Sequence, residues 1–108
     1  MSSFDEREGA FEKKFVLDAE QEFRVQARRN KILGIWVAGI LGKTGDDIAA
    51  YALEVIKSDM EEAGDEDVFR KVKQDLIASG NEIPDVEIRE RMTVLLTEAR
   101  VQIVDEIK

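Results

Sequence analysis

The tripeptide Gly42-Lys43-Thr44 is the first place in this sequence where residue types and spacing suggest chemistry, because it matches the end of a phosphate-binding loop. Such a loop needs another glycine five positions before Gly42, where this chain has Val37, and it needs a strand leading into it. The apolar spacing before Gly42 is helical instead. We therefore interpret Gly42-Lys43-Thr44-Gly45 as a turn between two helices, with Thr44 capping the second.

Other catalytic chemistry is restricted by composition, because the 108 residues include no histidine and no cysteine. These absences exclude disulfides, thiolate nucleophiles, zinc-thiolate sites, imidazole bases and histidine-ligated metals. The acidic residues are scattered and do not form a calcium-binding loop. We predict no catalytic residue, no metal and no required cofactor, and expect a protein that works by binding.

The distribution of charge along the chain excludes some classes of binding partner. The net charge is −8, yet residues 1–31 are balanced, so the acidic surplus lies after them. A nucleic acid or an anionic membrane surface needs a concentrated basic face, so we expect neither as a partner. The longest apolar run, residues 32–41, is too short to cross a bilayer. With an acidic start that lacks a signal-like apolar stretch, we expect a cytoplasmic protein, monomeric when free.

Apolar residues recur at helical spacing along the whole chain, which predicts an all-α fold, a four-helix bundle with antiparallel neighbours. The first helix is predicted to run from Phe4 to Leu41, with Trp36 in the core, and the second to end near Ala63, where Gly64 stops it. The inward residues of the second helix are predicted as Ala49, Ala52, Leu53, Ile56 and Met60. A third helix, capped by Asp65 and closed by Gly80, has inward positions Val68, Phe69, Val72 and Leu76. The fourth starts at Asp85, with inward positions Ile88, Met92, Leu95, Leu96, Ala99, Ile103 and Ile107.

The first helix is too long for a compact bundle. At about 1.5 Å per residue it would measure about 57 Å, about twice the second helix. Gly9 lies inside it and weakens the helix by roughly 1 kcal/mol relative to alanine. We therefore predict an extended, partly mobile N-terminal helical arm over residues 1–18 and a four-helix body over residues 19–108.

Four of the five phenylalanines fall in the first 23 residues, at Phe4, Phe11, Phe15 and Phe23. Their steps of seven, four and eight residues place them on one helical stripe. An amphipathic arm uses such a stripe to fill a groove on another protein. The alternative is that Phe15 and Phe23 cover part of the core of the bundle.

The densest basic cluster consists of Arg28, Arg29 and Lys31. These residues are candidate contacts for a phosphate or an acidic partner. The alternative is that they are solvated charges on an exposed helix face.

Several stretches make the chain resemble the ATPase inhibitor subunit zeta family of alphaproteobacterial F-type ATP synthases. The most specific are Ala27-Arg28-Arg29-Asn30 and Leu41-Gly42-Lys43-Thr44-Gly45, with Ser3-Phe4-Asp5-Glu6-Arg7-Glu8 at the start. The resemblance implies a four-helix protein whose N-terminal segment enters a catalytic α/β interface of the synthase head and blocks rotation in the direction of ATP hydrolysis.

The resemblance also supplies partners and contact residues. It implies binding to the catalytic head, built from α, β and γ subunits, at the inner face of the membrane without insertion into it. Carried over by position, the contact candidates are Phe4, Arg7, Phe11, Lys14 and Phe15. The alternative is a helical sensor or adaptor that binds ATP or ADP and has no inhibitory activity.

Overall fold

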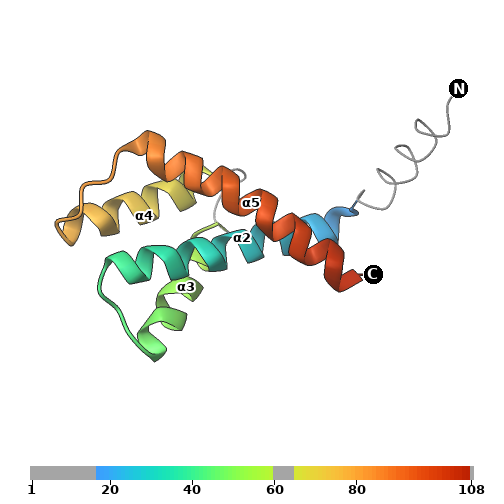
Figure 1. The fold of residues 1–108 in the computed structure, drawn as a ribbon, viewed down its shortest axis with the longest axis horizontal. Helices are drawn as coiled ribbons and strands as arrows, with labels where there is room; N and C mark the ends of the chain where they lie inside the picture. Colours follow the sequence, from blue (N-terminus) through green and yellow to red (C-terminus); the bar gives the residue numbers. More distant parts are fainter. Residues whose placement is uncertain (1–16, 60–64, 108) are drawn as a thin grey trace, which may run out of the picture.

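Four α-helices make up most of the computed structural model, which describes residues 17–59 and 65–107 (Figure 1). The helices are α2 (Ala19–Ile40), α3 (Asp46–Ser58), α4 (Glu66–Ala78) and α5 (Asp85–Ile107). No strand occurs in these two described ranges, so the predicted all-α, four-helix fold is confirmed. Residues 1–16 of the predicted arm lie outside the described residues.

The beginning of α2 corrects the prediction of an uninterrupted first helix from Phe4 to Leu41. Asp18 is the N-cap of α2 and has an extended backbone, with ψ 177°. Its side chain accepts a hydrogen bond from the Gln21 amide at 2.8 Å, and the Gln21 side chain accepts one from the Asp18 amide at 3.1 Å. This reciprocal capping box starts a new helix at Ala19. The sequence contains the spacing Asp18-x-x-Gln21, which is typical of a capping box and could have indicated a helix start at this position.

Two glycines in left-handed conformation end α2 and α4. Gly42 has φ +80° and Gly80 has φ +84°. After α2 the Lys43 amide donates to the Ala38 carbonyl at 3.0 Å, and after α4 the Asn81 amide donates to the Leu76 carbonyl at 2.9 Å. Both are Schellman ends, which favour glycine. The interpretation of residues 42–45 as a turn is thus confirmed, although Gly45, and not Thr44, is the N-cap of α3.

The buried face of α3 differs from its prediction. Tyr51, Ala52 and Val55 are buried, whereas the predicted inward residues Ala49 and Leu53 are exposed. Helix α3 also ends at Ser58, before the predicted end near Ala63. Met60, Ala63 and the predicted stop Gly64 lie outside the described residues.

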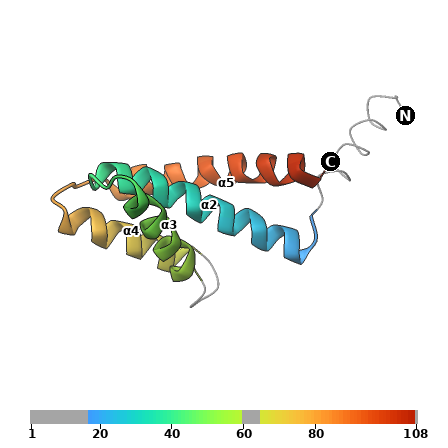
Figure 2. The ribbon, with the colours of Figure 1, turned by 90° about the horizontal axis from the view of Figure 1, so that it is seen from below.

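The core has two parts of unequal size. Helix α2 contacts the other three helices, and α5 runs antiparallel beside its whole length (Figure 2). The main core, where all four helices meet, consists of Leu33, Val37, Ala38, Tyr51, Val55, Val68, Phe69, Val72, Leu76, Ile88, Met92 and Leu95. A smaller cluster of Val25, Ala99 and Ile103 joins α2 and α5 alone. We call this second region the α2–α5 end.

The α2–α5 end exists because the helices differ in length. Helices α2 and α5 have 22 and 23 residues, whereas α3 and α4 have 13 each. The part of α2 that exceeds the short helices is covered by the similar excess of α5. The partly buried Trp36, predicted in the core, lies at the edge of the main core with the Arg91 guanidinium 4.9 Å from its ring centroid.

Candidate partner-binding site

The predicted inhibitory contacts Phe4, Arg7, Phe11, Lys14 and Phe15 all lie outside the described residues. What the structure describes is the place where that segment joins the body. Leu17 is partly buried and packs against the small cluster between α2 and α5. The segment 1–16 is therefore attached at the α2–α5 end.

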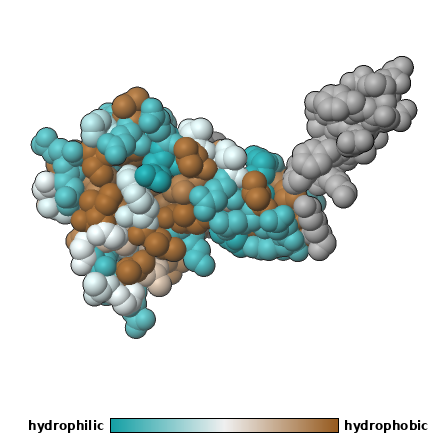
Figure 3. Space-filling view, in the orientation of Figure 1, coloured by the Kyte–Doolittle hydropathy of each residue, from teal (hydrophilic) through white to brown (hydrophobic). Residues whose placement is uncertain are grey.

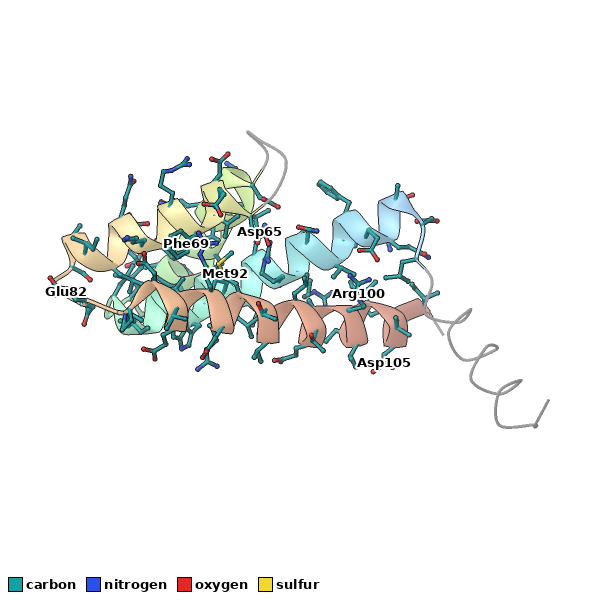
Figure 4. All side chains as sticks on the ribbon, turned by 90° about the horizontal axis from the view of Figure 1, so that it is seen from above. Asp65, Phe69, Glu82, Met92, Arg100 and Asp105 are labelled. Carbon is teal, nitrogen blue, oxygen red and sulfur yellow. The ribbon has the colours of Figure 1, made fainter. Side chains whose placement is uncertain are left out.

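Ion pairs hold this attachment point together. The Arg100 guanidinium points from α5 toward α2 and forms a pair with Glu22, with Nη2 3.1 Å from Oε2 (Figure 4). The hydrogen bonds to Glu22 raise the pKa of Arg100. Farther along α2, Arg28 donates to Gln102 at 2.8 Å and pairs with Glu106 at 2.6 Å. Arg28 is thus occupied by α5.

Arg29 is not a solvated charge, because its side chain is only 1% exposed. Its Nε donates to the Asn30 Oδ1 at 2.6 Å, and its Nη2 donates to the Asp65 Oδ1 at 2.9 Å. Asn30 in turn donates to Asp59 at 3.0 Å. Helix α2 therefore holds the residue after α3 and the residue before α4. The acidic group that Arg29 meets belongs to its own chain.

Asp59, which accepts from Asn30, has a shifted pKa. Burial raises the pKa of Asp59, and the charges of Asp65 and Asp67 add to this, while the Asn30 hydrogen bond and the Arg29 charge lower it. Asp67 is 9% exposed, and its Oδ1 accepts from Arg70 at 2.8 Å. Within the described residues, no group of acidic side chains has the arrangement of a metal site. We interpret this network as structural.

A second polar cluster joins α3 to α4. The Tyr51 hydroxyl donates to Asp75 at 2.7 Å, and the Lys71 ammonium lies 2.9 Å from both Asp75 and Glu54. Burial, followed by the hydrogen bond to Asp75, raises the pKa of Tyr51 above its ordinary range. Burial lowers the pKa of Lys71, but its two carboxylate partners raise it by more. Tyr51 therefore stays neutral and serves to tie the two helices together.

An apolar groove between α2 and α3 is the surface feature that the sequence analysis missed. It has a volume of about 530 Å³ and is lined by Lys31, Ile35, Gly45, Ile48, Ala49, Ala52, Leu53 and Ile56. We call it the α2–α3 groove. Ile35 is 44% exposed and Leu53 is 50% exposed. Figure 3 shows hydrophobic side chains gathered over the region where α3 lies against α2.

The sequence contains a signal for this groove. The apolar residues of α3 form a surface that is wider than contact with one other helix can bury. They are Ile48, Ala49, Tyr51, Ala52, Leu53, Val55 and Ile56. Of the three predicted basic residues, only Lys31 lines this groove. Lys31 and Arg28 line a second hollow between α2 and α5 together, whereas Arg29 is buried.

A comparison with family models decides which family this arrangement belongs to. The model described as ATPase inhibitor subunit zeta matches residues 1–102. The chain belongs to the ATPase inhibitor subunit zeta family. The predicted resemblance is confirmed, and the match includes the N-terminal segment as well as the helical body. Membership indicates an inhibitor subunit and implies association with an ATP synthase.

A solved structure supports the fold of this zeta-family chain. A protein whose structure was determined in solution by NMR is 49% identical, with a TM-score of 0.70. The match covers 79% of this chain and 96% of that one. A search of curated proteins found no match. In the part of the zeta-family chain that the structure describes, no helix combines the length and apolar character that crossing a membrane requires.

Proposed function

We propose that the chain blocks ATP hydrolysis by an F-type ATP synthase, by inserting its N-terminal helix at a catalytic α/β interface of the head. The proposed contacts are Phe4, Arg7, Phe11, Lys14 and Phe15, with the helical body staying outside against the head. The observation that carries this proposal is the family match over residues 1–102, which extends through the aromatic segment.

The mechanism is mechanical, and no residue of the chain reacts. A rotary ATPase hydrolyses ATP only while its catalytic interfaces open and close, so a helix lodged between α and β stops the cycle. Aromatic side chains suit this task because each buries a large, rigid area. If the segment orders on binding, its affinity is the contact energy less about 2–5 kcal/mol of ordering cost.

The start of α2 gives the segment a suitable attachment. Because the backbone is extended at Asp18, α2 begins at Ala19 and does not continue through Asp18. Leu17 and the Glu22–Arg100 pair anchor the near end to the body. The body can then act as a handle that stays outside while the segment enters the interface.

The test is ATP hydrolysis by the cognate synthase with the full-length chain and with a chain lacking residues 2–15. We expect the full-length chain to inhibit and the shortened chain to fold, by circular dichroism, without inhibiting. Phe11→Ala should raise the half-inhibitory concentration about 10–30-fold, as expected for loss of an interface anchor.

Val86→Ala is the matched control, because Val86 is an apolar residue of the body with 67% exposure and belongs to no predicted contact. It should inhibit like the unchanged chain. Inhibition by the shortened chain would show that the segment is not the inhibitory element. Binding of ATP or ADP to a full-length chain that does not inhibit would favour the alternative, a nucleotide-binding sensor or adaptor.

A further inference from the structure

The exposed apolar residues of the α2–α3 groove are gathered on one concave surface. Ile35 and Leu53 are about half exposed and line the groove together with the exposed Ala49. Val86 and Val94 are exposed to a similar degree, but neither belongs to this groove. A contiguous apolar patch with a polar rim is typical of a surface that binds another protein, whereas scattered exposed valines are ordinary.

The lining of the groove favours a protein segment over a small molecule. Among the described residues that line it, Lys31 alone has a polar side chain. A small-molecule site combines its apolar lining with several convergent polar groups. The walls of the groove come from two helices, and the small side chains of Ala49 and Ala52 leave room for a third helix to approach. Such a groove suits the apolar face of an amphipathic helix.

The second hollow, between α2 and α5, continues this groove and is basic. It has a volume of about 360 Å³ and shares Lys31 and Ile56 with the groove. Its charged lining consists of Arg24, Arg28 and Lys31, against the one carboxylate of Glu106. The hollow therefore has a surplus of positive charge in a chain whose net charge is −8. We call the α2–α3 groove and this basic hollow together the docking face.

Two cations of the docking face are available to a partner. Lys31 is exposed and forms no ion pair with the described residues. Arg24 lies 3.5 Å from Glu20, and its side chain is still 60% exposed. Because an exposed pair of this kind is worth at most about 1 kcal/mol, a carboxylate of a partner can replace Glu20.

An exposed aromatic ring extends the docking face along α2. Phe23 lies one helical turn before Ala27, which lines the basic hollow. Phe23 is 62% exposed, so the alternative in which it covers the core is wrong. The ring is a further large apolar contact, of the kind that contributes most to protein interfaces.

We infer that the docking face binds an amphipathic, acidic helix on the outside of the synthase head. Apolar side chains of that helix fill the α2–α3 groove, and carboxylates at one end of its apolar stripe meet Lys31 and Arg24. The inference rests on the proposed function, which supplies the synthase as the partner. It adds the surface by which the body is held there and the chemistry of the segment that it contacts.

The two parts of the docking face have different tasks. Burial of apolar surface in the groove supplies most of the affinity, whereas the charges at one end fix the direction in which the partner helix lies. A body held in one orientation keeps the N-terminal segment close to its interface. Attachment at this second site raises the effective concentration of the segment there, so weak docking strengthens inhibition.

Leu53→Glu tests the apolar part, because it places a charge in the groove at an exposed position that folding should tolerate. The measurement is the dissociation constant of the full-length chain for the purified catalytic head of the cognate synthase. We expect the variant to raise this constant about 10–30-fold. Val94→Glu on α5 is the matched control, with 57% exposure outside the docking face, and should bind like the unchanged chain. Equal binding by both variants would overturn the inference.

Lys31→Gln tests the charged part. We expect it to raise the dissociation constant about 3–10-fold at low salt, and the difference from the unchanged chain should shrink as salt is added. Gln74→Glu is the matched control, because it changes the net charge by the same amount at an exposed position of α4. Equal effects of the two variants would contradict the acidic character of the partner helix.

The absence of cysteine allows the occupant to be identified directly. A photoreactive benzophenone on Leu53→Cys, in the full-length chain bound to the head, forms a cross-link that mass spectrometry locates. We expect the cross-link on a helix of the head that has apolar and acidic side chains. A cross-link to this chain itself, to a second copy of it, or to nothing would overturn the inference.

Maximal inhibition distinguishes a failure of docking from a failure of the proposed function. The Leu53→Glu chain has an unchanged N-terminal segment, so it should still inhibit fully when its concentration is high enough to saturate the head. If the unchanged chain bound through the docking face without inhibiting, the proposed function would fail and the inference would stand. If the chain inhibited while Leu53→Glu bound as tightly as Val94→Glu, the inference would fail and the proposed function would stand.

Discussion

Three neighbouring basic residues of α2 have three different environments. Arg28 reaches α5, Arg29 is buried against Asp65 before α4, and Lys31 faces the α2–α3 groove. Consecutive side chains on a helix point about 100° apart, so Arg29 points away from Arg28 and Lys31, which line one hollow. The density of charge alone could not reveal this, because the partners lie on other helices. The exposed neighbour Arg24, by contrast, pairs with Glu20 of its own helix.

Arg29→Ala should lower the free energy of unfolding by about 2–4 kcal/mol, because it removes a buried cation and leaves its partners unpaired. The expected loss of stability is smaller than for breaking a fully buried ion pair, since the side chain of Asp65 is 45% exposed. The measurement is urea unfolding followed by circular dichroism. Arg24→Ala is the matched control and should change stability by less than about 0.5 kcal/mol. Equal effects would mean that burial of Arg29 contributes nothing.

At the scale of the elements, the prediction succeeded where a helix has one apolar face. The inward residues of α4, among them Val68, Phe69, Val72 and Leu76, are buried as predicted. It failed for α3, whose apolar residues cover both the core face and the groove face, so spacing alone could not say which face meets α2. The prediction failed at Asp18 because the helical spacing of apolar residues continues past this position, although Asp18 is the N-cap at which α2 begins.

Helices α2 and α3 lie close together because of Gly34. A Cβ added there would be 2.6 Å from the Ala52 Cα and 3.3 Å from a Val55 methyl group. Gly34→Ala should therefore lower the free energy of unfolding by about 1–3 kcal/mol, since the backbones must move apart. Urea unfolding measures the effect.

Gly39→Ala is the control for helix propensity, because an added Cβ there meets nothing within 4 Å. It should leave stability unchanged or raise it by up to about 1 kcal/mol. If both variants were equally stable, close approach at Gly34 would not constrain the packing of α3.

At the scale of the whole molecule, the sequence predicted four helices and a first helix longer than the second. It did not predict that α5 covers the extra length of the first helix. The similar lengths of α2 and α5 could not be inferred, because the predicted first helix ran through Asp18 without a break. The inhibitory contacts Phe4, Arg7, Phe11, Lys14 and Phe15 stay predictions, since they lie outside the described residues. The two cores that result are unequal, and the smaller one carries the attachment of the segment.

The α2–α5 end should open without unfolding the main core, because in the described part of the chain its cluster has just three buried residues, Val25, Ala99 and Ile103. Native-state hydrogen exchange measures this. Amides of α2 before Arg29 and of α5 after Ala99 should exchange with a smaller opening free energy than amides around Leu33 and Leu95.

Two core variants distinguish separate opening from global unfolding. Ile103→Ala removes packing from the α2–α5 end. It should lower the free energy of opening this end and the free energy of global unfolding, each by about 2–5 kcal/mol. Leu76→Ala removes packing from the main core, which stays folded when only the end opens. Leu76→Ala should therefore lower the free energy of global unfolding and leave the free energy of opening the α2–α5 end unchanged. If Leu76→Ala lowered both equally, the end would open only with the whole molecule, and the segment would be attached to a rigid handle.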